Sequence, residues 1–196
     1  MAIPPLAPNP AALEFLSSRR SRPAKTLTGP APDRAALEPI LTAALRVPDH
    51  GKLEPWRLIV LERAALVRIS GLVQGRGEAL GIEPEKIEKS TREYANSPLA
   101  IAVVSTPVLS EKVPQIEQTY SAGALCLALL NAALASGWGA NWLSGWPSHD
   151  PQFCAAAFGL GNGESVAGIV HIGTETAPPP ERPRPSLETK VSWVSQ

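Results

Sequence analysis

The centre of the chain carries the segment Leu99–Ser105, which reads Leu-Ala-Ile-Ala-Val-Val-Ser. A continuous apolar run of this length, with β-branched residues and no polar alternation, indicates a strand that is buried on both faces. Such a strand needs other strands beside it and apolar helices above and below it. The segment therefore predicts the central strand of a layered domain.

The flanking sequence supplies the other layers. Trp56–Leu61 reads as a second buried strand and Ser165–Ile172 as the last clear one. Gly137–Trp142 reads as a short strand or turn, and Val191–Val194 as a candidate final strand. Apolar spacing and proline starts predict helices over Pro10–Ser18, Pro32–Leu45, Ala64–Gly75, Pro84–Ala95, Pro114–Ser136 and Pro151–Phe158.

The longest of these helices, Pro114–Ser136, is almost entirely apolar from Ala122 onward. A helix that is apolar all round is expected to be fully buried. Four or five strands with as many helices give an α+β layer domain.

Composition limits the partners. The 196 residues are enough for one domain with a sizeable core. Lys and Arg number 18, as do Asp and Glu, so no overall field favours nucleic acid or an acidic membrane surface. Charged residues make up only 18% of the chain, which is low and suggests that extra surface is buried in a dimer.

Cysteine usage and the chain ends point to a cytoplasmic protein. Cys126 and Cys154 lie in apolar helical surroundings without metal-ligand spacing, as expected of buried reduced thiols. Met1–Pro10 shows no basic start followed by an apolar run. The longest apolar stretch, Ala122–Ala135, is too short to span a bilayer, so we expect no membrane association.

Proline clusters at the two ends of the chain. Ile3–Pro10 and Ala177–Pro185 are proline-rich and read as extended, polyproline-like arms. Such arms lie either on a neighbouring subunit or on the surface as tails. No linker divides the chain, and we expect one domain over residues 1–196.

Two cationic turns are candidates for an anion site. The first contains Arg19, Arg20 and Ser21 after an apolar helical segment, and the second contains Arg46 and His50 after another. Guanidinium groups beside a hydroxyl suit phosphate. The alternatives are a solvated basic turn for the first, and cations that complement a helix dipole for the second.

Other chemistry finds little support. The sequence contains no Gly-x-Ser-x-Gly, P-loop or Cys-x-x-Cys motif, and Gly75-Arg-Gly77 follows a helix rather than a strand. The three histidines, His50, His149 and His171, match no metal-ligand spacing. We therefore predict no protein nucleophile, no catalytic acid or base, and no metal.

Several motifs in order give the chain a resemblance to the FMN-dependent nitroreductase family, most of all to its small, minimal subgroup. They cover nearly the whole chain, and their order is more specific than any one of them. They are Arg19–Ser21, Arg46–Arg57 (Arg-Val-Pro-Asp-His-Gly-Lys-Leu-Glu-Pro-Trp-Arg), Ser121–Gly123, Gly137–Gly145, Phe158–Leu160, Ile172–Thr174 and Arg182–Pro185.

The resemblance implies a nitroreductase-like domain whose central, mostly antiparallel sheet of four to five strands is flanked by helices. It also implies an interwoven homodimer with FMN at the interface. Carried over by position, Arg19, Arg20 and Ser21 would hold the FMN phosphate and ribityl chain. Arg46 and His50 would come from the partner subunit. The remaining positions would be Trp142, Leu143 and Ser144 along the isoalloxazine, and Arg182 and Arg184 reaching the phosphate.

Two positions depart from the family pattern. Leu143 stands where the subgroup often carries Arg, and Glu54 stands where many members carry Gln before Pro-Trp. The first removes a possible contact, and the second adds a possible negative charge near the ring. A positive group near flavin N1 and C2=O would stabilise the reduced form, and Lys52 is one candidate.

The function that the resemblance implies is electron transfer from NADH or NADPH to a nitroaromatic, a quinone or a similar small acceptor by a ping-pong mechanism. The flavin would supply the redox chemistry, which agrees with the absence of a protein nucleophile. Two alternatives stay open. One is a protein that keeps FMN without turnover, and the other is a relative that performs dehalogenation or flavin fragmentation.

Overall fold

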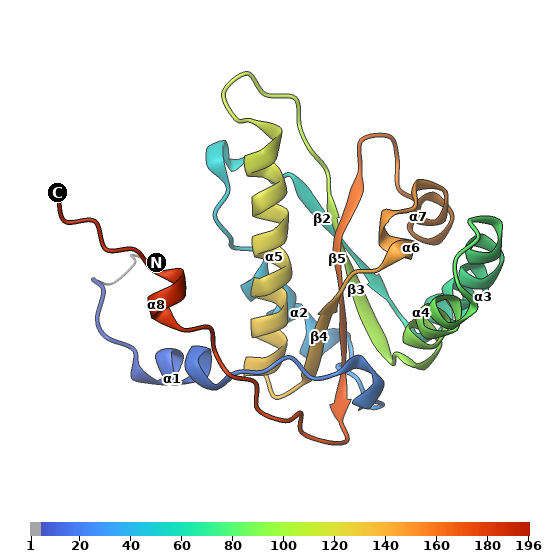
Figure 1. Cartoon of the computed structure of the whole chain (residues 1–196), viewed down its shortest axis with the longest axis horizontal. Helices are drawn as coiled ribbons and strands as arrows, with labels where there is room; N and C mark the ends of the chain where they lie inside the picture. The colour runs from blue at the N-terminus through green and yellow to red at the C-terminus, as the bar shows by residue number, and fades with distance from the viewer. Residues whose placement is uncertain (1–4) are drawn as a thin grey trace.

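A computed structural model describes residues 5–196 (Figure 1). Its five strands are β1 (Leu27–Thr28), β2 (Trp56–Leu61), β3 (Leu99–Ser105), β4 (Gly139–Leu143) and β5 (Ser165–Glu175). They form one sheet in the order β1-β5-β3-β2, and β4 also pairs with β5. Every pairing is antiparallel. The predicted central strand, β3, lies between β2 and β5, and the predicted antiparallel sheet is confirmed.

All seven residues of β3 are buried. Because side chains alternate along a strand, Ile101 and Val103 face one apolar core while Ala100 and Ala102 face another. The two cores lie on opposite sides of the sheet and are covered by different helices. The apolar run therefore specifies a three-layer arrangement, helices–sheet–helices (Figure 1).

One face of the sheet is covered by α2 (Arg34–Ala44) and α5 (Gln115–Ala135). Asp33 caps α2 by accepting a hydrogen bond from the Ala36 amide at 2.9 Å. The prediction that α5 is fully buried is wrong. Leu125 and Leu129 face the sheet, but the other side of the helix leaves Tyr120 and Leu127 exposed.

The other face is covered by α3 (Arg63–Ala79), α4 (Pro84–Asn96), α6 (Trp146–His149) and α7 (Pro151–Phe158). Helix α3 runs four residues past its predicted end at Gly75. Gly77 lies inside this helix, at a position where a Cβ would come within 2.6 Å of Ile87 Cγ1. Glycine thus allows α3 to approach α4 closely. Helix α7 ends as predicted, at Gly159 with a φ of 67°.

Other predictions for the strands need correction. Strand β2 is at the edge of the sheet and is mostly half-buried, with only Leu61 buried. Strand β5 is three residues longer than predicted because Gly173 pairs with Gly139 and Thr174 with Thr28. The prediction of a strand over Val191–Val194 is wrong, since this segment follows α8 (Leu187–Lys190) without regular structure.

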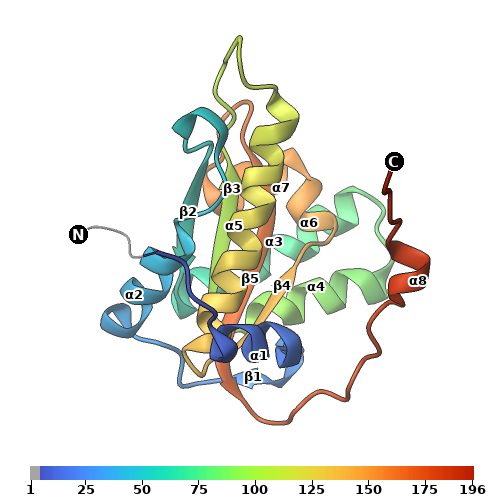
Figure 2. The same cartoon turned by 90° about the vertical axis from the view of Figure 1, so that its left-hand side faces the viewer.

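Helix α5 is long and apolar enough to meet the length and composition criteria of a membrane span. It packs against β3, β4, β5 and α2, as the core helix of a globular domain does. Figure 2 shows it lying along the sheet.

Candidate functional site

The first cationic turn begins where α1 (Pro10–Ser18) ends. Asn9 caps the start of α1 by accepting from the Ala12 amide at 3.1 Å. Arg19 leaves the helix with an extended backbone. Three residues later, the Arg22 amide donates to the Ala140 carbonyl at 2.8 Å. This bond ties the turn to β4, so that Arg19–Ser21 lie beside the sheet.

The C-terminal arm lies against this turn. Arg20 Nη2 donates to the Pro180 carbonyl at 3.0 Å, and Arg184 donates to the Ser17 carbonyl. The two segments enclose a cavity of about 740 Å³. Its lining includes Arg19, Arg20, Ser21, Arg182 and Arg184. The structure thus brings together all five residues that the resemblance assigned to the phosphate and ribityl chain, although they are about 160 positions apart in the chain.

Positive charge in this cavity is poorly compensated. Arg19 Nη2 donates to Ser21 Oγ at 3.1 Å, but the Nε atoms of Arg19 and Arg20 are buried without a hydrogen-bond partner among the described residues. Burial, followed by repulsion from Arg20 and Arg184, lowers the pKa of Arg19. The one carboxylate lining the described cavity, Glu181, is 82% exposed and lies 3.8 Å from Arg20 Nε. Buried donors without acceptors are costly, so a bound anion would stabilise this arrangement.

The second cationic turn is elsewhere in the chain. His50 begins the 3₁₀ helix η2 (His50–Lys52) and its Nδ1 lies 2.7 Å from Glu117 Oε2, in the first turn of α5. The first cationic turn, Arg19–Ser21, follows α1 and lies near the C-terminal end of α5 (Figures 1 and 2). Since α5 has 21 residues, about 30 Å separates its two ends. One chain therefore does not bring His50 to Arg19–Ser21.

The third predicted set lies on β4 and just after it. The Trp142 indole covers Gly168, where a Cβ would collide with it, and Trp142 is 37% exposed. Leu143 is half-buried and pairs with Ile169, while Ser144 is exposed. Residues 142–144 therefore form a partly apolar segment at the end of β4. The same strand is hydrogen-bonded, through the Ala140 carbonyl, to Arg22 just after the first cationic turn.

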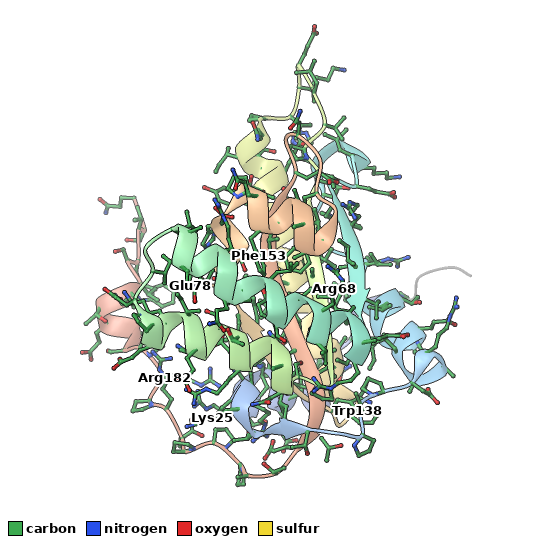
Figure 3. The ribbon with its side chains drawn as sticks, turned by 90° about the vertical axis from the view of Figure 1, so that its right-hand side faces the viewer. Lys25, Arg68, Glu78, Trp138, Phe153 and Arg182 are labelled. Carbon is green, nitrogen blue, oxygen red and sulfur yellow. The ribbon has the colours of Figure 1, made fainter. Side chains whose placement is uncertain are left out.

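A cavity of about 600 Å³ opens beside Leu143. It lies between β4, α4 and the 3₁₀ helix η1 (Ala24–Thr26), and Figure 3 shows Lys25 beneath α4. Three cations line it: Lys25, Lys89 and Arg92. Sequence reasoning missed them because they come from separate elements. The only signal was the run of charges on one face of Pro84–Ala95. Lys52 instead lies on η2, near the start of α5.

The two cysteines are buried, and the described residues offer no candidate metal cluster. The described residues contain no group of three or more His, Cys, Asp or Glu that could hold a metal. Cys126 and Cys154 are free and buried, and burial raises their pKa values to about 12 and about 11, as inert thiols require.

Residues 16–174 match the model of the Nitroreductase family. The chain belongs to this family. It is 36% identical over 163 residues to the Escherichia coli (strain K12) protein named "Putative NAD(P)H nitroreductase YdjA", a match covering 83% of this chain and 87% of that protein.

Solved nitroreductase structures share the fold. The nitroreductase-like family protein from Bacillus cereus superposes with a TM-score of 0.79 at 21% identity, covering 98% of this chain and all of that one. The "FMN and NADPH-dependent nitroreductase NfnB" from sphigopyxis sp. strain HMH gives 0.69 at 20% identity, covering 94% and 99%. At these identities the likeness shows the nitroreductase fold alone.

Proposed function

We propose that this protein is a cytoplasmic, FMN-dependent oxidoreductase that passes electrons from NADH or NADPH to nitroaromatics, quinones or similar small acceptors by a ping-pong mechanism. The observation that carries the proposal is the cavity lined by Arg19, Arg20, Ser21, Arg182 and Arg184. FMN ends in one phosphate dianion, and the cavity offers several guanidinium donors with little competing negative charge.

The donor set fits a phosphate better than it fits the protein alone. The two buried Nε atoms need acceptors, and Ser21 adds a hydroxyl that already accepts from Arg19. Phosphate oxygens would satisfy both Nε atoms and remove the repulsion among the arginines. No dinucleotide-binding glycine loop follows a strand in the sequence, which favours FMN over FAD.

The cavity beside Leu143 is where we place the ring and the acceptor. A bound flavin supplies hydride and electron transfer, and the protein supplies position and electrostatics. Trp142, Leu143 and Ser144 would line the ring. Lys25, Lys89 and Arg92 would oppose the negative charge that reduction adds. This chain has Leu143 where the subgroup often carries Arg, so cations on α4 and η1 would compensate the charge of the reduced ring instead.

Purified protein tests the proposal directly. We expect it to be yellow and to release FMN on denaturation, identified by chromatography. NADH or NADPH should then bleach the bound flavin faster than it bleaches free FMN. Protein that fails to bind added FMN contradicts the proposed cofactor. Bound flavin that NAD(P)H bleaches no faster than free FMN indicates an FMN-binding protein without turnover.

We further propose that two copies of the chain build each site. Members of this family are typically dimers. Along α5, Ile116, Tyr120 and Leu127 are 53%, 68% and 46% exposed and recur on one helical face. A second copy packed there by a two-fold axis would bury this face. It could also bring one chain's His50, which lies about a helix length from Arg19–Ser21 within one chain, to the other chain's Arg19–Ser21, and we place Arg46 of the same chain there with it.

Complementation distinguishes sites shared between chains from sites within one chain. Arg19→Ala and His50→Ala are made separately, and conditions are chosen where each homodimer binds FMN poorly. The heterodimer is then isolated with two tags. Shared sites predict one tight FMN per heterodimer, because one site has both wild-type turns and the other has both lesions. No tight site, or a stable monomer that binds FMN fully, contradicts the shared site.

A further inference from the structure

Glu93, on α4, lies between two cavities. It lines the cavity of about 600 Å³ beside Leu143, and it also lines a small cavity of about 10 Å³ beneath Leu143–Gly145. Among the described lining residues, it is the one ionisable group common to both cavities and the one acid in the larger cavity. A single carboxyl group therefore faces the proposed ring and acceptor site.

The cations of the larger cavity compensate Glu93 only weakly. Lys89 Nζ lies 4.0 Å from Glu93 Oε1, at the limit of an ion pair, and Arg92 instead contacts Glu88 Oε1 at 3.1 Å. Lys25 lines the cavity from η1 without an ion pair to Glu93, and Asn141 of β4 is uncharged. Burial raises the pKa of Glu93, and Lys89 opposes the shift.

The small cavity offers Glu93 no positive charge. Ser97 Oγ donates to the Leu99 carbonyl at 3.0 Å, so it must accept from His171 Nδ1 at 2.9 Å. Burial lowers the pKa of His171 to about 4, which keeps the ring neutral with Nε2 as an acceptor. Burial also raises the pKa of Tyr94, so its hydroxyl stays protonated, and Ser148 is uncharged. Only neutral groups face Glu93 from this side.

Reduction of a quinone or nitro group consumes protons as well as electrons. NAD(P)H delivers a hydride, which is two electrons and one proton, and leaves the site more negative by one charge. A quinone that takes up the hydride equivalent still needs one further proton at its second oxygen to become a neutral quinol. That proton must come from a group in the site or from water.

We propose that Glu93 supplies this proton: it binds a proton from solvent when the cofactor is reduced and gives it to the oxygen of the acceptor. Added negative charge favours the neutral carboxylic acid, and the acceptor's departure as quinol returns Glu93 to the carboxylate. This inference rests on the proposed function and assigns the proton donor of its second half-reaction.

The variant Glu93→Gln tests the assignment in FMN-loaded protein. Proton uptake on two-electron reduction, measured with a pH indicator in weak buffer, should fall by up to one proton per site. Reoxidation by benzoquinone should slow by about 10-fold or more, in the range of general acid catalysis. Reoxidation by ferricyanide, which takes electrons without protons, should stay within two-fold. Glu93→Asp should recover part of the benzoquinone rate.

The control is Glu85→Gln, which changes an exposed acid on the same helix that lines neither cavity. It should behave as wild type. Equal rates in Glu93→Gln and wild type, or an equal loss with benzoquinone and ferricyanide, would overturn the assignment. If either result is found while the wild-type protein still oxidises NAD(P)H with its bound flavin, the Glu93 assignment fails but the proposed function does not. Wild-type protein without flavin or without NAD(P)H-dependent reduction refutes both.

Discussion

Two groups of arginines in this molecule meet opposite surroundings. Arg57 and Arg76 each form a two-pronged pair with one carboxylate, Arg57 with Glu164 at 2.7 and 2.9 Å and Arg76 with Asp150 at 2.7 Å on both prongs. Arg19 and Arg20 have buried Nε atoms without a hydrogen-bond partner among the described residues, and Arg19 lies close to the like charges of Arg20 and Arg184. The paired arginines join elements of the fold, whereas the unpaired ones leave donor capacity for a ligand.

The two groups should therefore fail in different assays. Loss of a paired group should lower the stability of the protein without specific loss of FMN. Loss of an unpaired arginine should weaken FMN binding without lowering the stability of the apoprotein.

Asp150→Ala should have the largest effect. Asp150 receives both prongs of Arg76 and also caps α7 by accepting from the Phe153 amide at 2.7 Å. Loss of the cap and of a charged hydrogen-bonded pair should lower the free energy of unfolding by about 3 kcal/mol, measured by urea denaturation of the apoprotein. Asp150→Asn keeps a capping oxygen and should lose less. Wild-type stability in Asp150→Ala would contradict the structural role.

Arg19→Ala should lose about 1.5–3 kcal/mol of FMN binding free energy, which is roughly one to two decades in Kd. Titration of the apoprotein with FMN measures it. The free energy of unfolding of the apoprotein should not fall, because the substitution removes repulsion from Arg20 and Arg184. An unchanged Kd for FMN would mean that Arg19 does not contact the phosphate.

The Arg57–Glu164 pair should appear in the acid stability profile. The hydrogen bonds from Arg57, and then that from the Gly161 amide, lower the pKa of Glu164 to about 2. Because this pKa lies below the unfolded value, the pair stabilises at higher pH, and the contribution is lost as the pH falls from about 4.5 towards 2. Since Arg57 is 40% exposed, the effect should be about 1 kcal/mol or less.

Glu164→Gln should flatten this part of the profile, measured as unfolding free energy against pH. Glu38→Gln is a matched control, because its pair with Arg34 is exposed, and it should keep the wild-type profile. The role of Glu164 would be refuted if both variants lost the same acid-dependent stability.

Arg34→Ala should have the smallest effect. Arg34 pairs with Glu38 one turn along α2, but its side chain is 92% exposed. Exposed pairs of this kind contribute little. Both the urea midpoint and the FMN Kd should match wild type. A clear loss of FMN affinity here would show that arginine loss acts through overall charge rather than through the cluster at Arg19.

Local patterns predicted much of the fold. Leu99–Ser105 gave a buried strand because an unbroken apolar run needs cover on both faces, and Asp33 and Gly159 marked helix ends by their capping chemistry. Burial of α5 was overpredicted because an apolar side chain suits a core and a subunit interface equally. The length of α3 was underpredicted because the prediction ended the helix at Gly75, while the close contact of Gly77 with Ile87 becomes visible only in three dimensions.

The site residues likewise fall into some that the sequence predicted and some that it did not. Arg19–Ser21 stood out as a contiguous motif, and the structure joins it to Arg182 and Arg184, as the resemblance implied. Lys25, Arg92 and Glu93 carry no motif, since the packing of α4 against η1 and β4 is what gathers them. Sequence patterns reveal residues that act as neighbours in the chain more readily than residues that the fold brings together.

The central claim is that the arginine cluster holds a phosphate, and comparison of FMN with riboflavin tests it most directly. Riboflavin has the same ring and ribityl chain but no phosphate. Titrated into wild-type apoprotein, FMN should bind at least about 100-fold more tightly, as two or more charged hydrogen bonds imply, and Arg19→Ala should narrow the ratio. Equal affinities for FMN and riboflavin in the wild-type protein would contradict the account.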